Sequence, residues 1–501
     1  MKGSFGLRGA VCAAALFAGG AAQADVTAAD VWADWKDQLS AYGDDNVTIG
    51  AEETSSGVVT VRDLVIQVVD VEATITTTVD TITFNEQSDG TVRITMDDSV
   101  PLVIENTADG VVINVNLNQN NLEMIVSGEP DAMNYAVTAD AYSIALQDVV
   151  DGDMTLTGEA SLTANNVDFA YTTTVGDLRT LTYEGTVEST DFIIDFQIPG
   201  GNGEYITAGG QYGKMDMQAD MTLPLDADFE NPDNLFVDGF GFDGGYTIDG
   251  LEFVMDVNAE GDQIAGSGIM GAAALDVRLD STVLAYDAKT TDIDFSFTSS
   301  GFPLPIEVSL GEYGIGLLMP AAQSEEAADF GLSFDLVDLA ISDSIWGLFD
   351  PGQVLPRDPA TFQLALAGKA RVLADLFDPA QQAALASTDA PFEPQEITLE
   401  TLNLSVAGAS VTGDGMFTFD NTDTTTFAPL PRPEGEATIQ INGLNQLLDN
   451  VVSMGLVPAD QVMGPRMMMG MFARSTGDDQ METSIEILPD GQVNVNGNRV
   501  R

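Results

Sequence analysis

The sequence contains one cysteine, Cys12, and no histidine. Because Cys12 lies in the N-terminal leader, the rest of the chain has neither a thiol nor an imidazole. This excludes disulfides, metal sites built on Cys or His, and nucleophilic catalysis that depends on either residue. We therefore expect a protein that is not an enzyme and that binds no cofactor.

Acidic residues are missing from the first 24 positions, which read as an export signal. Lys2 and Arg8 supply positive charge, Ala10 to Ala18 form a short apolar core, and Ala22-Gln23-Ala24 gives a small-x-small cleavage pattern. We predict that residues 1–24 are a cleaved signal peptide and that the mature protein is periplasmic. No later run reaches the ~20 apolar residues that a spanning helix needs.

Basic residues are scarce throughout the chain. It has 17 Lys and Arg against 79 Asp and Glu, a formal net charge of −62, and only Arg179 and Lys214 lie between Arg93 and Arg278. Such a chain repels nucleic acid and anionic headgroups, so nucleic-acid partners are not expected. Two readings of the acidity stay open: a cationic partner, or adaptation to a salty habitat.

From about Val47 to Met319 apolar and polar residues alternate with period two, the pattern of half-buried antiparallel strands. Turn signals such as Asp151-Gly152-Asp153 and Asp243-Gly244-Gly245 separate them. We predict a mainly β fold with a large twisted antiparallel meander sheet, which either curls into a groove or splits into a sandwich. Clear examples of the alternation are Val111–Leu117, Phe192–Ile198, Leu251–Val257 and Ile293–Phe297.

Helical spacing is clearest at the two ends of the mature chain, and a short helix is also expected from Ser342 to Phe349. Thr27 or Asp30 can cap an N-terminal helix that ends at Gly43 and covers the end of the sheet, and a helical hairpin is expected near the C-terminus. The composition divides the chain into a helix-plus-sheet region, residues 25–320, and a mixed region, 321–501. Alternatively, residues 25–501 form one continuous domain.

The second helix of this hairpin, which starts after Pro458, is rich in methionine. Met suits a deformable apolar surface or core packing, whereas a soft-metal site would space its thioethers in a polar loop. Asp-rich turns, such as residues 238–249, lack the order of a calcium loop. The sequence thus predicts no metal site and one candidate apolar surface: Met463, Met467, Met468, Met471 and Phe472.

Several strings make the chain resemble a known family. It is similar to uncharacterised exported alphaproteobacterial proteins with a domain of unknown function, the DUF2125 type, and more loosely to periplasmic β-groove proteins of the AsmA and YdgA type. The first resemblance implies no activity and no site residues. The strings that carry it are Asp30-Val31-Trp32, Leu317–Pro320, Ser342–Pro359, Asp420–Asp423, Gly455–Pro458 and Met463-Gly464.

Four functional hypotheses follow. The first is a non-catalytic binding or envelope-associated protein with an apolar or lipid groove, and the second is a structural or interaction module without a cavity. The third is an outer-membrane barrel, although the chain ends in Asn498-Arg499-Val500-Arg501 without a terminal aromatic residue. The fourth is a hydrolase that uses two converging carboxylates, one with a raised pKa. A lipid or an envelope protein is the expected class of partner.

Overall fold

The structure is a computed structural model. It describes residues 26–501 except 44, 70–71, 107, 109, 153, 199–202, 228–234, 260 and 382–390. The predicted signal peptide therefore lies outside the described residues.

The described helices stand where the sequence predicts them. They are α1 (Ala28–Ser40), α2 (Asp343–Phe349), α4 (Leu444–Ser453) and α5 (Ala459–Phe472). At the start of α1, the hydroxyl of Thr27 accepts from the backbone N–H of Asp30, and the Asp30 carboxylate accepts from that of Thr27. This capping box satisfies two N–H groups that otherwise lack partners at a helix start, which confirms the predicted N-terminal helix.

Strands make up most of the chain. The first group is β1 (Val47–Ser55), β2 (Val58–Val69), β3 (Ala73–Glu86), β4 (Val92–Met96), β5 (Ser99–Asn106), β6 (Val112–Asn120), β7 (Glu123–Glu129), β8 (Ala132–Asp151) and β9 (Met154–Leu156). The second group is β10 (Gly158–Val175), β11 (Arg179–Gln197), β12 (Tyr205–Tyr212), β13 (Met215–Leu223), β14 (Gly241–Ile248), β15 (Leu251–Ala259), β16 (Asp262–Met270), β17 (Ala273–Asp280) and β18 (Val283–Ser299). The third group is β19 (Phe302–Pro320), β20 (Ala328–Ile341), β21 (Ala360–Val372), β22 (Phe392–Val406), β23 (Ala409–Asp420), β24 (Arg432–Asn442), β25 (Arg474–Gly477), β26 (Gln480–Ile487), β27 (Val493–Val495) and β28 (Asn498–Arg499).

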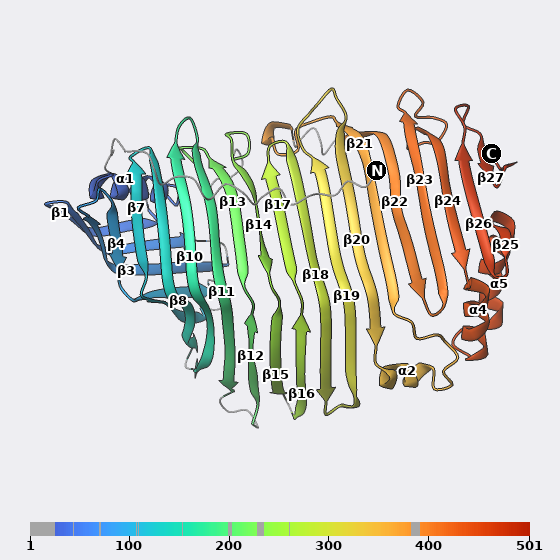
Figure 1. Ribbon diagram of the computed structural model, residues 1–501, viewed down its shortest axis with the longest axis horizontal. Helices are drawn as coiled ribbons and strands as arrows, with labels where there is room; N and C mark the ends of the chain where they lie inside the picture. Colours follow the sequence, from blue (N-terminus) through green and yellow to red (C-terminus); the bar gives the residue numbers. More distant parts are fainter. Residues whose placement is uncertain are drawn as a thin grey trace.

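All of these strands belong to one antiparallel sheet of 28 strands. Long strands such as β11 and β18 run the full height of the sheet. Between them, short strands stand end to end, β12 below β13, β15 below β14 and β16 below β17 (Figure 1). The prediction of a large antiparallel sheet with an N-terminal helix and a C-terminal helical hairpin is confirmed. The sheet continues without a break where β19 pairs with β20.

The main core lies at the N-terminal end, where the first strands run across the others and α1 packs on β2 and β3 (Figure 1). Trp32 and Trp35 contact the ring of Phe84 at centroid distances of 5.6 and 5.2 Å. A helix laid over the end of the sheet is what the apolar stripe of this segment predicted. The buried members of this cluster include Val31, Val61, Leu64, Ile82, Ile94, Val126, Met133 and Tyr135.

The rest of the sheet has little core. A second buried cluster consists of only Ala139, Val167 and Val187. Outside these two clusters, most residues of the described strands are half-buried or exposed. Both faces of the sheet are therefore largely open to solvent.

A line of unusual backbone geometry, which we name the crease, crosses the sheet near the middle of the strands. Asp63, Asn166, Asp292 and Asp338 have φ between 50° and 57° in β2, β10, β18 and β20. The pairing register is the same on both sides of Asp63, Asn166 and Asp292, which are thus left-handed positions inside otherwise regular strands and not bulges. At Asp338 the pairing with β19 keeps its register, whereas the pairing with β21 shifts by one residue.

The crease changes which residues share a face. In a regular strand, residues three apart point to opposite faces. Yet Val61 and Leu64 are buried in the same cluster. Val79 packs against the cluster that contains Ile82, and Ala164 packs against the one that contains Val167. The apolar residues therefore stay on one face while their positions in the sequence change from odd to even or the reverse.

Glycines on the neighbouring strands make room for the crease. A Cβ on Gly50 would lie 2.7 Å from the Cβ of Asp63, one on Gly271 would lie 3.0 Å from that of Asp292, and one on Gly311 would lie 3.3 Å from that of Asp338. Any larger residue at Gly50 or Gly271 would have to displace an aspartate that is already in a constrained conformation.

Candidate apolar binding face

Below the crease, one face of the central sheet is built from two apolar rows. Directly paired residues of antiparallel strands lie on the same face. The first row runs across β11, β12, β15, β16, β18 and β19 through Phe192, Gly210, Phe253, Gly268, Phe295 and Val308. The second consists of Ile194, Ala208, Met255, Gly266, Phe297 and Ile306. We name these two rows the apolar face.

Phenylalanine rings lie over glycines on this face. A Cβ on Gly268 would fall 2.4 Å from the Phe295 ring and 2.5 Å from the Phe253 ring, and one on Gly266 would fall 2.4 Å from the Phe297 ring. The same relationship joins Phe192 to Gly210. Rings that lie across a strand cover its backbone, so they shield the hydrogen bonds of the sheet and form a low, continuous apolar surface.

The described helices leave this surface uncovered. Their main contacts within the described part of the chain are with β1, β2, β3, β19 and β23, and between α4 and α5. The rings of Phe253 and Phe295 are half-buried by their neighbours in the sheet and carry no second layer. Further up, Tyr246 and Tyr286 are each 37% exposed. A row of aromatic and aliphatic side chains on which no described helix packs is a candidate binding surface.

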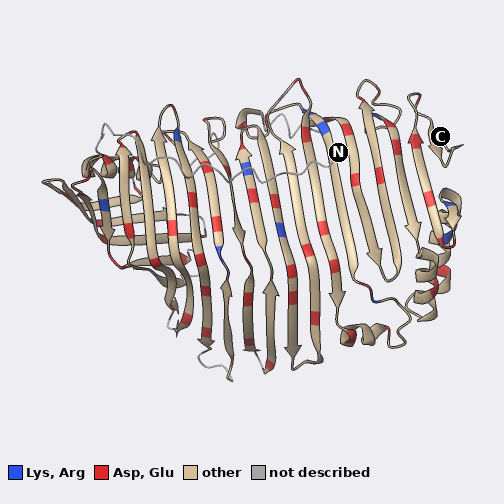
Figure 2. Cartoon of the chain, viewed as in Figure 1, with Lys and Arg blue, Asp and Glu red and all other residues tan. Residues whose placement is uncertain are grey.

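The opposite face carries the acidic residues. Its rows contain Asp191, Glu252, Asp294 and Glu307, which alternate along the strands with the apolar face. Acidic side chains are spread over the whole sheet, and basic ones are few (Figure 2). This face is not uniformly polar, because Val254 is 62% exposed between these acids.

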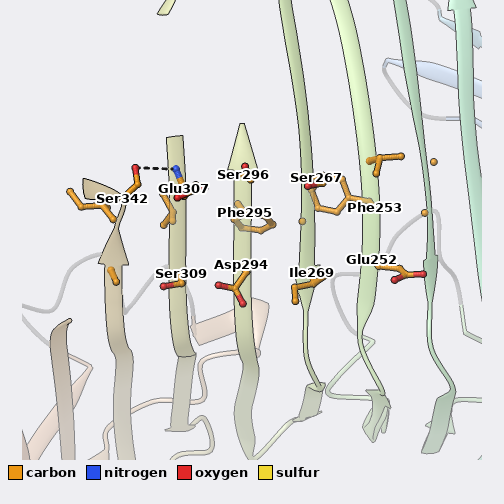
Figure 3. Close-up of a pocket in the computed structure, with 17 residues that line it drawn as sticks. Glu252, Phe253, Ser267, Ile269, Asp294, Phe295, Ser296, Glu307, Ser309 and Ser342 are labelled. Carbon is orange, nitrogen blue, oxygen red and sulfur yellow. Dashed lines mark hydrogen bonds between the residues drawn. The ribbon is translucent and has the colours of Figure 1, made fainter. Parts of the chain in front are cut away.

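A groove of about 810 Å³ crosses the lower part of the sheet (Figure 3). Most of its lining residues, such as Glu252, Asp294 and Glu307, belong to the acidic face, and the others, such as Phe253 and Phe295, come from the row between them. At one end it reaches Ser342, which precedes α2 and whose N–H donates to the Glu307 carbonyl at 2.9 Å. The lining thus mixes exposed apolar residues such as Val254 and Ile269 with acidic and serine side chains.

The methionines that the sequence singled out are exposed. Met463, Met467, Met468 and Met471 of α5 expose 63–69% of their surface and Phe472 exposes 41%, whereas Val462 is the one buried residue of this helix. They form an apolar surface, which was one of the two readings of this segment. α5 lies beside α4 at the C-terminal end of the sheet (Figure 1), so the structure does not bring it together with the groove.

A buried ion pair joins α1 to the central sheet, and the sequence analysis did not anticipate it. Arg179 at the start of β11 donates to Asp34, to the Asp37 carboxylate at 2.7 Å and to the Thr173 hydroxyl at 3.1 Å. The side chains of Arg179 and Asp34 are 6% and 5% exposed. Burial alone would lower the pKa of Arg179, but its bonds to these two carboxylates raise it, so the charge persists.

The titratable groups of the central strands include a facing pair of carboxylates. No group of three or more acidic, His or Cys side chains within the described residues is arranged to hold a metal ion. Asp276 and Asp287 face each other across β17 and β18, and the pKa of Asp287 is raised by burial first and by Asp276 second. Both residues are exposed, and neither lines the groove. No described helix is long and apolar enough to cross a membrane.

Comparison with known proteins gives a family and little else. A family model described as an uncharacterized protein conserved in bacteria, DUF2125, matches residues 242–498. No curated protein and no solved structure matches the chain. The matched residues run from β14 to β28 and include most of the lower apolar rows, the groove, and α2, α4 and α5. Because this match spans just over half of the sequence, the chain belongs to the DUF2125 family.

Proposed function

We propose that this protein is a non-catalytic binding protein of the bacterial envelope that holds the apolar chains of lipids on the open face of its sheet. The single observation that carries the proposal is the apolar face. Its rows join side chains from six successive positions in the sheet, and no described helix packs on the strands between β12 and β18.

The shape of this surface suits an acyl chain. Rings of Phe253, Phe295 and Phe297 lie over glycines and next to one another, with centroid distances of 6.0 and 6.1 Å, so they form a continuous surface. Each methylene of a bound chain that leaves water contributes about 0.8 kcal/mol. A chain of ordinary length therefore binds with useful affinity even on a shallow surface.

The charge pattern indicates which lipids would be bound. Glu252, Asp294 and Glu307 lie on the opposite face of the strands that form the apolar face, and the chain as a whole is strongly acidic. Like charges repel at close range, so neutral headgroups are favoured over anionic ones. Export to the periplasm, proposed from residues 1–24, would place the protein where envelope lipids are found.

A pair of variants on adjacent residues tests the proposal. Phe253 belongs to the apolar face, whereas Val254 is 62% exposed and lies on the opposite face of the same strand. Binding of fluorescent phosphatidylethanolamine, supplied below its aggregation concentration, would be titrated for the mature protein and for Phe253→Asp and Val254→Asp. Far-ultraviolet circular dichroism would establish that both variants retain the sheet.

We expect saturable binding by the wild type, a loss of at least tenfold for Phe253→Asp, and little change for Val254→Asp. A wild-type protein that binds no lipid would overturn the proposal. So would two folded variants that bind equally well, because the apolar face would then not be the site.

A further inference from the structure

The C-terminal helix α5 exposes one side that no described residue covers. Met463, Met467 and Met471 are spaced by four residues and therefore lie along one side of the helix, with Met468 and Phe472 next to them. On the other side, Val462 is buried and Arg466 donates to the Asn445 carbonyl and the Asp449 carboxylate of α4, at 3.2 and 2.6 Å. The methionine side thus faces away from the protein.

The charge around this helix differs from that of the rest of the chain. Residues 461–477 contain no Asp or Glu, and this is the longest such run after the leader. The run includes Arg466 and Arg474, whose side chains are 36% and 64% exposed. Their ion pairs with Asp449 and Glu482 are partly exposed and hence weak. Elsewhere the acidic surface repels a membrane, but here that repulsion is absent.

The exposed apolar side chains continue along the same edge of the sheet. α2, α4 and α5 lie along its lower right border (Figure 1). In α2, Leu348 and Phe349 are 58% and 38% exposed, and Val354 and Leu456 in the adjoining loops are 40% and 49% exposed. The Asn450 side chain of α4 donates to the Val354 carbonyl at 3.4 Å, which holds the two parts together. We name the exposed apolar residues of α2, α5 and these loops the helical edge.

We propose that the helical edge docks on the surface of a phospholipid bilayer. The inference rests on the proposed function, because it supplies the place where lipid chains enter. Helices with a wide apolar side of Met, Leu or Phe and flanking arginines bind at the boundary between headgroups and acyl chains. α2 contacts β19, the strand that ends both apolar rows, so the docked edge brings the apolar face next to the bilayer.

Vesicle flotation tests the docking separately from lipid binding. The mature wild-type protein would be mixed with vesicles of phosphatidylcholine and phosphatidylethanolamine and centrifuged through a density gradient. The test variant is Met467→Glu combined with Met471→Glu. The matched control is Val237→Glu combined with Leu430→Glu, at residues of similar exposure, 56% and 60%, outside the helical edge. All proteins would also be titrated with soluble fluorescent phosphatidylethanolamine.

We expect the wild type and the control to float, and the vesicle partition coefficient of the Met variant to fall by roughly 100-fold, as the loss of two inserted side chains implies. Soluble lipid binding should be unchanged in all three. A wild type that stays at the bottom of the gradient, or a Met variant that floats as the control does, overturns the inference and favours a protein partner. Flotation without soluble lipid binding would overturn the proposed function and leave the docking intact.

Discussion

The ring of Phe295 on β18 occupies the space above Gly268 on β16 that a side chain would otherwise fill. An added Cβ would lie 2.4 Å from this ring, closer than any stable contact. On the other side of Gly268, the ring of Phe253 makes a similar contact at 2.5 Å. One glycine therefore seats two rings, and the shape of the apolar face depends on it.

Gly268→Ala should destabilise the protein, because both rings must leave their positions. Overpacking of this kind costs about 1–3 kcal/mol. Gly209→Ala is the matched control, since a Cβ there would meet only a carbonyl oxygen at 3.5 Å. Urea unfolding of the two variants measures the difference. Equal unfolding midpoints would show that the rings do not depend on the glycine.

Arg179→Met should strongly destabilise the N-terminal end. It leaves the Asp34 carboxylate, 5% exposed, without its main partner, and breaking a buried pair costs about 3–5 kcal/mol. Arg474→Met removes an arginine that is 64% exposed and paired with Glu482, so it should cost no more than about 1 kcal/mol. Thermal unfolding followed by the fluorescence of Trp32 and Trp35 reports on this region. Equal losses in the two variants would contradict the assigned role of Arg179.

Asp338→Val should destabilise the sheet more than Asp329→Val. Both residues lie on β20, but only Asp338 has a positive φ, 57°. A β-branched residue tolerates this conformation poorly, and the expected extra cost is about 1–3 kcal/mol. Asp338→Gly should be as stable as the wild type, since glycine adopts positive φ without strain. Chemical unfolding of the three variants is the measurement, and a tolerated valine at 338 would rule out strain at the crease.

Asp287→Asn should raise the unfolding temperature at neutral pH. Burial and the facing Asp276 raise the pKa of Asp287 in the folded protein above its ordinary value. The folded state therefore binds this proton more tightly than the unfolded state, so stability falls as the pH rises through the folded pKa. The gain from Asn should shrink as the pH falls below that point and vanish in acid. A gain that does not vary with pH would point to a cause other than the charge.

Much of the fold could be predicted from local pattern. The stripe of Val31, Trp32 and Trp35 predicts a helix whose apolar side packs on the sheet, and α1 does so. The alternation in 251–257 and 293–297 predicts strands β15 and β18. A groove and a sandwich produce the same alternation, however, because each buries one face of every strand. The sequence alone therefore could not show whether the strands form one continuous sheet or two packed sheets.

The sequence analysis missed the crease because its detection requires a comparison of the apolar positions in the two halves of each strand. On β18, Leu284 and Tyr286 occupy even positions, whereas Phe295 and Phe297 occupy odd ones. Asp292, the residue at positive φ, lies between these two halves. A shift of phase that coincides with Asp, Asn or Gly in successive strands was the available signal.

The apolar face and the groove depend on pairings between distant segments. Phe253 lies beside Gly210 because β15 pairs with β12, past β13 and β14. Side-chain periodicity cannot reveal such a neighbour. The cluster of methionines in α5 can be identified from sequence because it is local. Its separation from the groove could not be predicted, since it depends on how the strands pair.

The crease also limits how a sheet of this kind can lengthen or shorten over evolution. A hairpin inserted among the central strands must bring a left-handed residue or a glycine at the same level. Without such a residue, the inserted hairpin would place its apolar side chains on one face of the sheet below the crease and on the opposite face above it. Whole hairpins can therefore be gained or lost, and strand tips can vary in length, but a single-residue deletion near Asp292 or Asp338 would put half a strand out of phase with its neighbours.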